Sequence, residues 1–194
     1  MGNTKEKLMD AALELFSQKG YHATSVDEIA ESIGIKGPNI YKYFKGKEGL
    51  FEELHTRWDI SYRSKMGLEG GPVINNGKDL KKVSIEQISF TMNDDNVKKL
   101  RKMYTIEQFR TEHLSRQATI HQYTNITRMF KGVFDHLIEK GVMDPCDSEL
   151  LALEYVAPMT LLLQLTDREP DRKDEAMDLI NRHIDSFISK YLKA

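Results

Sequence analysis

The chain has 194 residues, of which 40% are hydrophobic and 30% charged, and its formal net charge is −2 at pH 7. This composition is typical of a folded globular protein and excludes an intrinsically disordered chain. The small net charge excludes a protein that coats nucleic acid over its whole surface, but it leaves room for a local basic patch. A single cysteine excludes an intrachain disulfide, and no apolar run approaches the roughly 20 residues of a membrane helix. We therefore expect a cytoplasmic protein.

The first fifty residues predict three short helices, each defined by apolar spacing and a cap or breaker. Gly20 stands where a left-handed residue would end the first helix. Ser25 and Glu28 match a capping box, which predicts the start of the second helix, and Gly34 ends that helix. Pro38 favours the first position of a third helix, with the preceding glycine as its cap. The predicted helices cover residues 4–19, 26–33 and 38–44.

Helical periodicity continues through the rest of the chain, and no segment has a strong strand pattern. The segment 67–77 holds four glycines, a proline and two asparagines, so we expect a loop or connector there. The remaining predicted helices cover residues 47–66, 78–92, 94–110, 115–140, 150–165 and 173–192. The predicted fold class is therefore all-α with about nine helices. We expect a helix-turn-helix domain over residues 1–47 and a larger helical domain over 48–194.

The third predicted helix carries the chemistry that points to DNA. In a helix-turn-helix motif the second helix of the pair enters the major groove and presents its N-terminal residues to base edges. Asn39 can pair with adenine, and nearby lysines can neutralise phosphates; these are Lys36, Lys42, Lys45 and Lys47. Residues 1–50 nevertheless hold seven lysines against seven acidic residues. Charge alone therefore leaves an ordinary solvated surface as an equal alternative.

Residues 8–51 resemble the N-terminal domain of the TetR (also called TetR/AcrR) family of bacterial transcriptional repressors. Spaced elements carry the resemblance in the right order: Ala11-Ala12 with Phe16, Gly20-Tyr21 with Thr24-Ser25-Val26 and Ile29-Ala30, Gly34-Ile35 with Ile40-Tyr41 and Tyr43-Phe44, and Lys47-Glu48 with Leu50-Phe51. The resemblance implies an all-helical homodimer that binds a palindromic DNA operator as a repressor. It also implies a larger domain that binds a small-molecule effector, which releases the DNA.

Carried over by position, the resemblance assigns DNA-contacting roles to nine residues. The phosphate-contacting positions at the start of the second helix are Thr24 and Ser25, and Lys47 also falls at a phosphate contact. The base-reading positions are Lys36, Pro38, Asn39 and Lys42, and the backbone-contacting positions are Tyr41 and Tyr43. The chain departs from the family pattern at Pro38, which lacks an N–H donor where the family often has glycine.

The larger predicted domain offers candidates for an effector pocket and a dimer interface. Large residues of its middle helices are pocket candidates, although simple core packing is the alternative for each of them: Phe90, Met103, Tyr104, Phe109, Tyr123, Phe130 and Met159. The last two helices would form half of a four-helix dimer interface, with contacts from Leu151, Tyr155, Leu162, Ile184, Phe187 and Ile188. The alternative for the helix over 150–165 is a central core helix within one subunit. We expect the fourth helix and the connector 58–77 to act as the lever through which effector binding changes the position of the DNA-binding domain.

The sequence holds no nucleophile–base motif and no phosphate-cradling glycine loop, so we do not expect an enzyme, a cofactor or a metal site. Scattered histidines such as His113, His121 and His136 lack metal-ligand spacing. The alternative function, from another class, is a helical ligand-binding or scaffold protein whose N-terminal head binds a protein partner. Salt would hardly alter the affinity for such a partner, whereas DNA binding falls steeply with salt.

Overall fold

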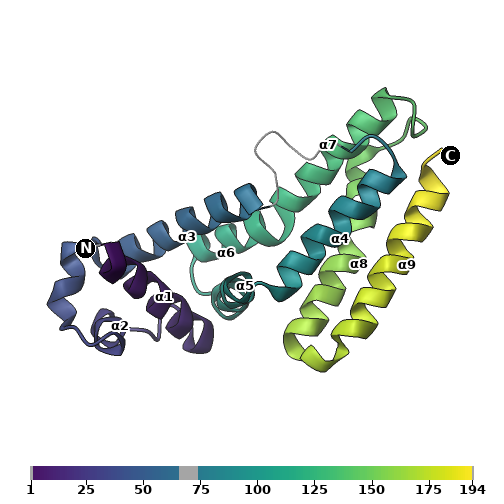
Figure 1. Ribbon diagram of the computed structural model, residues 1–194. Helices are drawn as coiled ribbons and strands as arrows, with labels where there is room; N and C mark the ends of the chain where they lie inside the picture. The colour runs from purple at the N-terminus through teal and green to yellow at the C-terminus, as the bar shows by residue number, and fades with distance from the viewer. Residues whose placement is uncertain (1, 66–73, 194) are drawn as a thin grey trace. The chain divides into compact units, whose positions relative to one another are not determined.

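The computed structural model describes residues 2–65 and 74–193 and is helical almost throughout (Figure 1). Across the described ranges the chain forms nine α-helices and three short helical segments of other types, together with one isolated β-bridge between Met143 and Leu192. The predicted all-α class is confirmed. Among the helices described, none combines the length and apolar character needed to cross a membrane.

The chain divides into two compact units that do not follow the predicted boundary at residue 47. The first unit comprises Met1–Glu69 and Asp95–Arg116, and the second comprises Gly70–Asp94 and Gln117–Ala194. Helices of the first unit are α1 (Gly2–Lys19), α2 (Val26–Ser32), the 3₁₀ segment η1 (Gly37–Lys42), α3 (Gly46–Lys65) and α5 (Asp95–Glu107). Residues 66–73, which include most of the predicted loop 67–77 and part of the predicted lever 58–77, lie outside the described residues.

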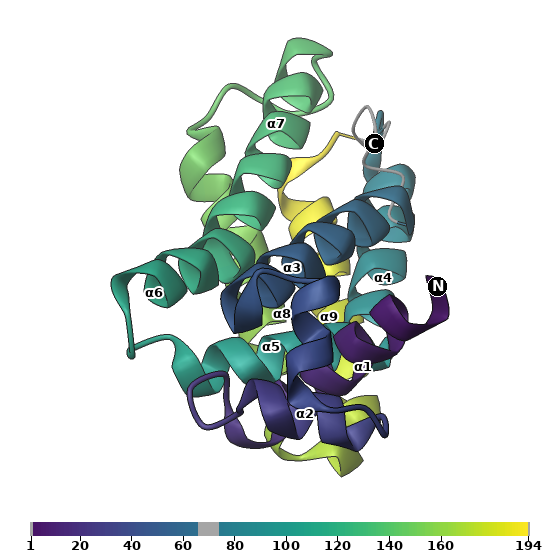
Figure 2. The ribbon, with the colours of Figure 1, turned by 90° about the vertical axis from the view of Figure 1, so that its left-hand side faces the viewer.

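The first unit is built on the apolar face of α1. Leu8, Ala12 and Phe16 are fully buried, as the spacing of apolar residues over this segment predicts. The ring of Phe16 lies 6.3 Å from the ring of Phe51 on α3 and 5.3 Å from the ring of Tyr21. Helix α1 also packs against α2 and α5 (Figure 2). A segment from the predicted larger domain thus completes the core around the DNA-binding motif.

The second unit contains the longer helices. They are α4 (Gly77–Asn93), α7 (Asn125–Glu139), α8 (Ser148–Arg168) and α9 (Lys173–Tyr191), with the short segments η2 (Ile120–Thr124) and η3 (Pro170–Arg172). Helix α8 packs against α7, α9 and α4, and α4, α8 and α9 run side by side in Figure 1. The helix predicted over 115–140 is a continuous helical run of α6 (Glu112–Thr119), the π-helical η2 and α7. Periodicity did not predict the π-helical segment.

Aromatic rings fill the core of this unit around Tyr155. Its ring lies 4.5 Å from that of Phe187 and 4.9 Å from that of Phe130. Four residues predicted for the dimer interface are therefore buried within their own subunit: Leu151, Tyr155, Ile184 and Phe187. Leu162 and Ile188 are partly buried against the same core. A partner subunit could not contact the four buried side chains directly. The direction of Leu151 and Tyr155 could not be predicted, because α8 is apolar on nearly every side and its sequence does not reveal which stripe faces inward. Ile184 and Phe187 lie on the apolar stripe of α9, which packs into the core of its own subunit.

Candidate nucleic-acid interface

The turn between α1 and α2 depends on Gly20. Its φ of +89° lies in the left-handed region, and its N–H donates to the carbonyl of Phe16 at 3.0 Å, ending α1 as predicted. A Cβ atom at this position would lie only 2.0 Å from Oε1 of Glu107 on α5. Glycine is therefore required here for two reasons, the backbone conformation and the close approach of a second element.

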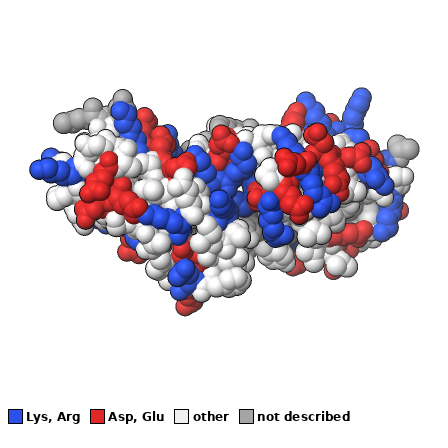
Figure 3. All heavy atoms as spheres, turned by 90° about the horizontal axis from the view of Figure 1, so that it is seen from below, with Lys and Arg blue, Asp and Glu red and all other residues white. Residues whose placement is uncertain are grey.

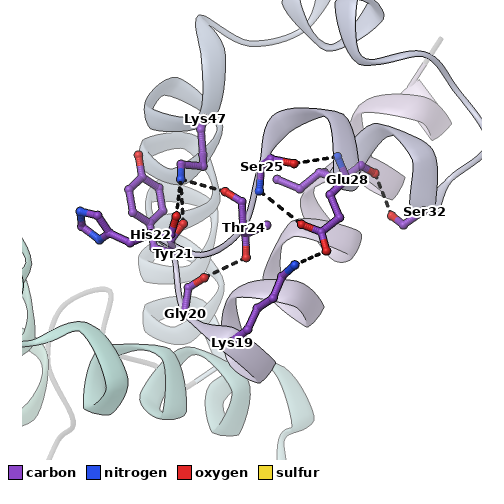
Figure 4. Close-up of polar contacts among 10 residues, drawn as sticks. Lys19, Gly20, Tyr21, His22, Thr24, Ser25, Glu28, Ser32 and Lys47 are labelled. Atoms are coloured by element: carbon purple, nitrogen blue, oxygen red, sulfur yellow. Dashed lines mark hydrogen bonds and ion pairs between the residues drawn. The ribbon is translucent and has the colours of Figure 1, made fainter.

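Thr24 and Lys47 hold the same turn from within. Thr24 is 1% exposed, and its hydroxyl donates to the carbonyl of Gly20 at 2.8 Å. The ammonium of Lys47 donates to the carbonyls of Tyr21 and Thr24, each at 2.8 Å, and lies 4.4 Å from the centre of the Tyr21 ring (Figure 4). Burial lowers the pKa of Lys47, and the nearby Glu107 carboxylate acts in the opposite direction.

Both residues were predicted to contact phosphate, and the structure gives their polar atoms other partners. The hydroxyl of Thr24 is buried, and the Lys47 ammonium is bonded to backbone carbonyls. The position of a residue in a family pattern does not by itself show the direction of its side chain. In this structure, Thr24 and Lys47 hold the turn instead of presenting their polar atoms to a ligand.

Helix α2 begins with the predicted capping box. The hydroxyl of Ser25 accepts from the N–H of Glu28 at 3.1 Å, and the Glu28 carboxylate accepts from the N–H of Ser25 at 3.4 Å (Figure 4). Lys19, at the end of α1, pairs with the same carboxylate. The hydrogen bond from Lys19 is the main reason that the pKa of Glu28 is lowered, followed by the bond from the Ser25 backbone. These contacts fix the start of α2, where Ser25 itself remains exposed.

The segment η1 packs closely against α2. Ile40 is fully buried, and a Cβ on Gly37 would lie 1.6 Å from a carboxylate oxygen of Asp27. The predicted helix over 38–44 is therefore present as a 3₁₀ segment in which Gly37 is the first residue and Lys36 the cap. With Ile40 and Gly37 turned inward, the opposite side of the segment is exposed. We call this side the η1 face and define it by Lys36, Pro38, Tyr41 and Lys42.

The η1 face combines positive charge with an exposed aromatic ring. Lys36 and Lys42 are exposed, Tyr41 is 65% exposed, and Asn39 and Tyr43 are half-buried beside them. Elsewhere the charges are mixed: Figure 3 shows basic and acidic side chains interspersed over the face that it draws. Six of the nine predicted DNA contacts are thus brought together on η1 and its edges, and exposed Ser25 caps the adjoining helix.

The predicted pocket residues do not form one group. Met103, Tyr104 and Phe109 belong to the first unit, whereas Phe90, Tyr123, Phe130 and Met159 belong to the second. Phe109 is 89% exposed and Tyr123 is 51% exposed, so neither lines a buried site within its unit. Tyr104 is buried, which raises its pKa. Phe130 and Met159 are part of the second unit's core, as the alternative interpretation of simple core packing expects.

Sequence reasoning missed a set of buried polar side chains in the second unit. The hydroxyl of Ser84 lies 2.7 Å from the hydroxyl of Tyr155, and both residues are buried. Gln87, one turn after Ser84 on α4, is also buried, and its amide nitrogen donates to the sulfur of Met129 at 3.5 Å. The amide nitrogen of Gln122, in the π-helical segment, is buried without a hydrogen-bond partner among the described residues. The sequence signal for these side chains was the presence of polar residues on the apolar stripe of α4, which indicates buried hydrogen-bonded groups.

The first unit thus has an exposed helical segment, η1, which packs on the capped helix α2, and a turn between α1 and α2 that is held by side-chain hydrogen bonds. This arrangement is that of a helix-turn-helix motif. Residues 8–54 match the family model described as "Bacterial regulatory proteins, tetR family". The match confirms the resemblance found in the sequence for this N-terminal part of the chain.

Relatives with known names match a part of the chain of similar length. The "Probable HTH-type transcriptional regulator YttP" of Bacillus subtilis is 50% identical over 60 residues, which are 31% of this chain and 29% of that protein. The "Biofilm operon icaADBC HTH-type negative transcriptional regulator IcaR" of Staphylococcus aureus is 43% identical over 49 residues, or 25% of this chain and 26% of that protein. The chain thus spans less than a third of the length of these relatives.

Solved structures share the fold over nearly the whole chain. SmeT, the repressor of the Stenotrophomonas maltophilia multidrug efflux pump SmeDEF, is 18% identical with a TM-score of 0.73, covering 97% of this chain and 90% of SmeT. The regulator FadR from Bacillus subtilis, in complex with stearoyl-CoA, is 22% identical with a TM-score of 0.72, covering 95% of this chain and 97% of FadR. At these identities the likeness establishes the fold.

Proposed function

We propose that the chain is a ligand-responsive transcriptional regulator that represses by binding a palindromic DNA operator as a homodimer. The observation that carries the proposal is the η1 face, where Lys36, Pro38, Tyr41 and Lys42 are exposed on a segment that lies within the family match over residues 8–54. A short helical segment with exposed cations and its N-terminal residues outward suits insertion into a major groove. We place the protein in the cytoplasm, where bacterial operators lie.

A second copy would complete the DNA-binding assembly. Helix-turn-helix dimers contact two half-sites about one helical turn, ~34 Å, apart, so a fixed interface is needed between copies. Helix α8 carries an exposed apolar stripe formed by Leu150, Leu153 and Leu161, which follow one another at intervals of about one and two helical turns. Exposed apolar stripes of this kind are typical of helix–helix association. We assign the dimer interface to this stripe and the adjoining surface of α9.

The effector is proposed to be a largely apolar small molecule with a polar end. SmeT has been solved in complex with triclosan, and FadR in complex with stearoyl-CoA. The second unit of this chain combines an apolar core with the buried polar side chains of Ser84 and Gln87 and the buried amide nitrogen of Gln122. Polar groups of this kind within an apolar site orient a ligand. The binding of such a molecule would favour one arrangement of the two DNA-binding heads over another.

Selection from a random duplex DNA library tests the proposal. The purified full-length chain should enrich a sequence with two inverted half-sites, and its affinity for that sequence should fall steeply with salt. Adding apolar compounds, including long-chain acyl thioesters, should then release the DNA. If no sequence is enriched at low salt, the proposal fails. A protein partner bound with little dependence on salt would favour the alternative, a head that docks on another protein.

A further inference from the structure

Glu107 is an acidic residue buried in the first unit, outside the family match. It is the last residue of α5, is 0% exposed, and lies 85 positions from its partner His22 in the α1–α2 turn. Its Oε2 atom is 2.8 Å from Nδ1 of His22 and 3.6 Å from Nε of Arg110. Because a carboxylate only accepts hydrogen bonds, Nδ1 of His22 must donate. Burying a carboxylate costs free energy unless the charge is paired. An apolar side chain could fill the same space without this cost, which indicates a role for the charge itself.

The carboxylate also touches the backbone of the turn. Its Oε1 atom lies so close to Gly20 that a Cβ on that residue would be 2.0 Å away. The same oxygen is buried and has no hydrogen-bond partner in the described ranges. Glu107 therefore contacts the turn at two places, the backbone of Gly20 and the ring of His22, and it depends on His22 and Arg110 for its pairing.

A cation supports the turn from another element. The ammonium of Lys47, on α3, donates to the carbonyls of Tyr21 and Thr24. The turn over residues 20–24 is thus held by an anion from α5 and a cation from α3. Its next residue is Ser25, which caps α2, and α2 is the helix on which η1 packs. A series of consecutive contacts therefore connects Glu107 to the η1 face.

We propose that Glu107 is a positioning residue for DNA binding, which sets the α1–α2 turn through His22 and Gly20 and thereby the orientation of α2 and η1. The inference rests on the proposed function. Glu107 does not contact DNA. Glu107 is one of several contacts between α1 and α5, because the two helices pack against each other with Leu100 and Met103 of α5 buried, and Glu14 and Lys99 pair at their surface, 2.5 Å apart.

The test compares operator affinity among full-length variants, using the sequence that the wild-type chain selects. Glu107→Gln keeps the shape of the side chain and removes its charge, and we expect a loss of about tenfold in affinity, as for residues within one ion-pair network. Glu14→Gln removes a charge from the exposed pair of the same helices and should change affinity little. His22→Asn keeps an N–H donor at the position of Nδ1 and should retain most of the affinity, whereas His22→Ala should lose as much as Glu107→Gln.

The double variant His22→Ala with Glu107→Gln separates positioning from a direct role. If Glu107 acts through His22, the double variant should bind no worse than either single variant. Additive losses, or normal affinity in folded Glu107→Gln, would overturn the inference. Circular dichroism checks that each variant is folded, and the exposed His22 variants test the same contact if Glu107→Gln does not fold. If the wild-type chain selects no DNA sequence, the proposed function fails instead.

Discussion

Lys45 and Lys47 lie two residues apart in the sequence, yet their side chains meet different surroundings. Lys45 is exposed, whereas the Lys47 ammonium is half-buried against the carbonyls of Tyr21 and Thr24. An exposed lysine beside a DNA-binding segment can neutralise a phosphate and release a counterion. A lysine bonded to backbone carbonyls instead stabilises the turn that those carbonyls form.

Replacing lysines of the two kinds by methionine should separate the two roles. Because Lys47→Met removes the donor for two carbonyls, we expect it to lower the free energy of unfolding by about 1–3 kcal/mol. Lys42→Met, on the η1 face, should leave stability unchanged and reduce the slope of log affinity against log salt by about 0.9 for each phosphate that is no longer neutralised. Urea unfolding and salt titrations of operator binding measure the two quantities. A reduced salt slope with unchanged stability in Lys47→Met would return this residue to the phosphate-contacting role that the family position implies.

A second residue-scale prediction concerns Asp135. Its carboxylate accepts from Lys131 at 2.7 Å and from the hydroxyl of Ser148, the first residue of α8. These hydrogen bonds hold the pKa of Asp135 below its ordinary value of 3.8. A carboxyl whose pKa is lower in the folded state stabilises the fold above its unfolded pKa, and this contribution is lost as the pH falls through the folded value.

Asp135→Asn should therefore be destabilising at neutral pH and nearly neutral in strong acid. The side chain is partly exposed, so we expect a loss of up to about 1 kcal/mol at pH 7. The difference from wild type should shrink as the pH falls below 3.8 and through the folded pKa of Asp135. Urea unfolding of both proteins at pH 7 and in acid measures this difference, with Asp144→Asn as a surface control. An equal difference at both pH values would show that the carboxylate charge is not the cause.

At the scale of elements, α2 is too short to be stable by itself. It has seven residues, and isolated helices of this length are not stable in water. Its order comes from the capping box, from the Lys19–Glu28 pair and from burial of Ile29 and Ala30. The function of η1 depends on α2, because η1 packs on it. The cap residue Ser25 is thus both a structural group and an exposed candidate for phosphate contact.

Two substitutions of Ser25 should distinguish these roles. Ser25→Ala removes the cap and should lower stability by about 1 kcal/mol. Ser25→Asp keeps a good cap, so stability should be maintained, while the added negative charge should weaken operator binding if Ser25 faces a phosphate. Thermal unfolding and operator affinity measure the two effects, and Ser32→Ala at the far end of α2 serves as the control. Full affinity in a folded Ser25→Asp variant would remove Ser25 from the DNA contacts.

Elements with local signals could be predicted from the sequence, and those that depend on distant contacts could not. The Ser25–Glu28 capping box is formed by residues close in the chain, and it is present as predicted. Periodicity reveals neither the 3₁₀ form of η1 nor its close approach to Asp27. Likewise, no residue near Glu107 in the sequence indicates that it is buried. Its burial follows from packing against a turn 85 residues away.

At the scale of the whole molecule, the packing of α8 leaves one stripe of an apolar helix uncovered. Tyr155 and Leu151 face the core, so Leu153 and Leu161 face outward. The same reasoning shows why the sequence predicted that α8 is covered on most sides but not which of its residues the subunit covers itself. An all-round apolar helix must be covered on most sides, but only the fold determines which side the subunit covers itself.

Leu161→Glu should therefore dissociate the proposed dimer. Leu161 is 66% exposed in the single chain, and a carboxylate placed between two copies would lose its water without gaining a partner. We expect the mass in solution to fall from twice 22.4 kDa to 22.4 kDa, measured by sedimentation equilibrium. Operator affinity should fall on the order of 100-fold, since the two half-sites would be bound separately.

Ile60→Glu provides the matched control for this change. Ile60 is 60% exposed on α3 in the first unit, so the substitution adds the same charge at a similarly exposed apolar site outside the α8 stripe. Its mass should remain that of a dimer. A Leu161→Glu variant that stays dimeric would place the interface on another surface. A variant that becomes monomeric yet keeps full operator affinity would show that the two heads do not need a fixed connection to bind DNA.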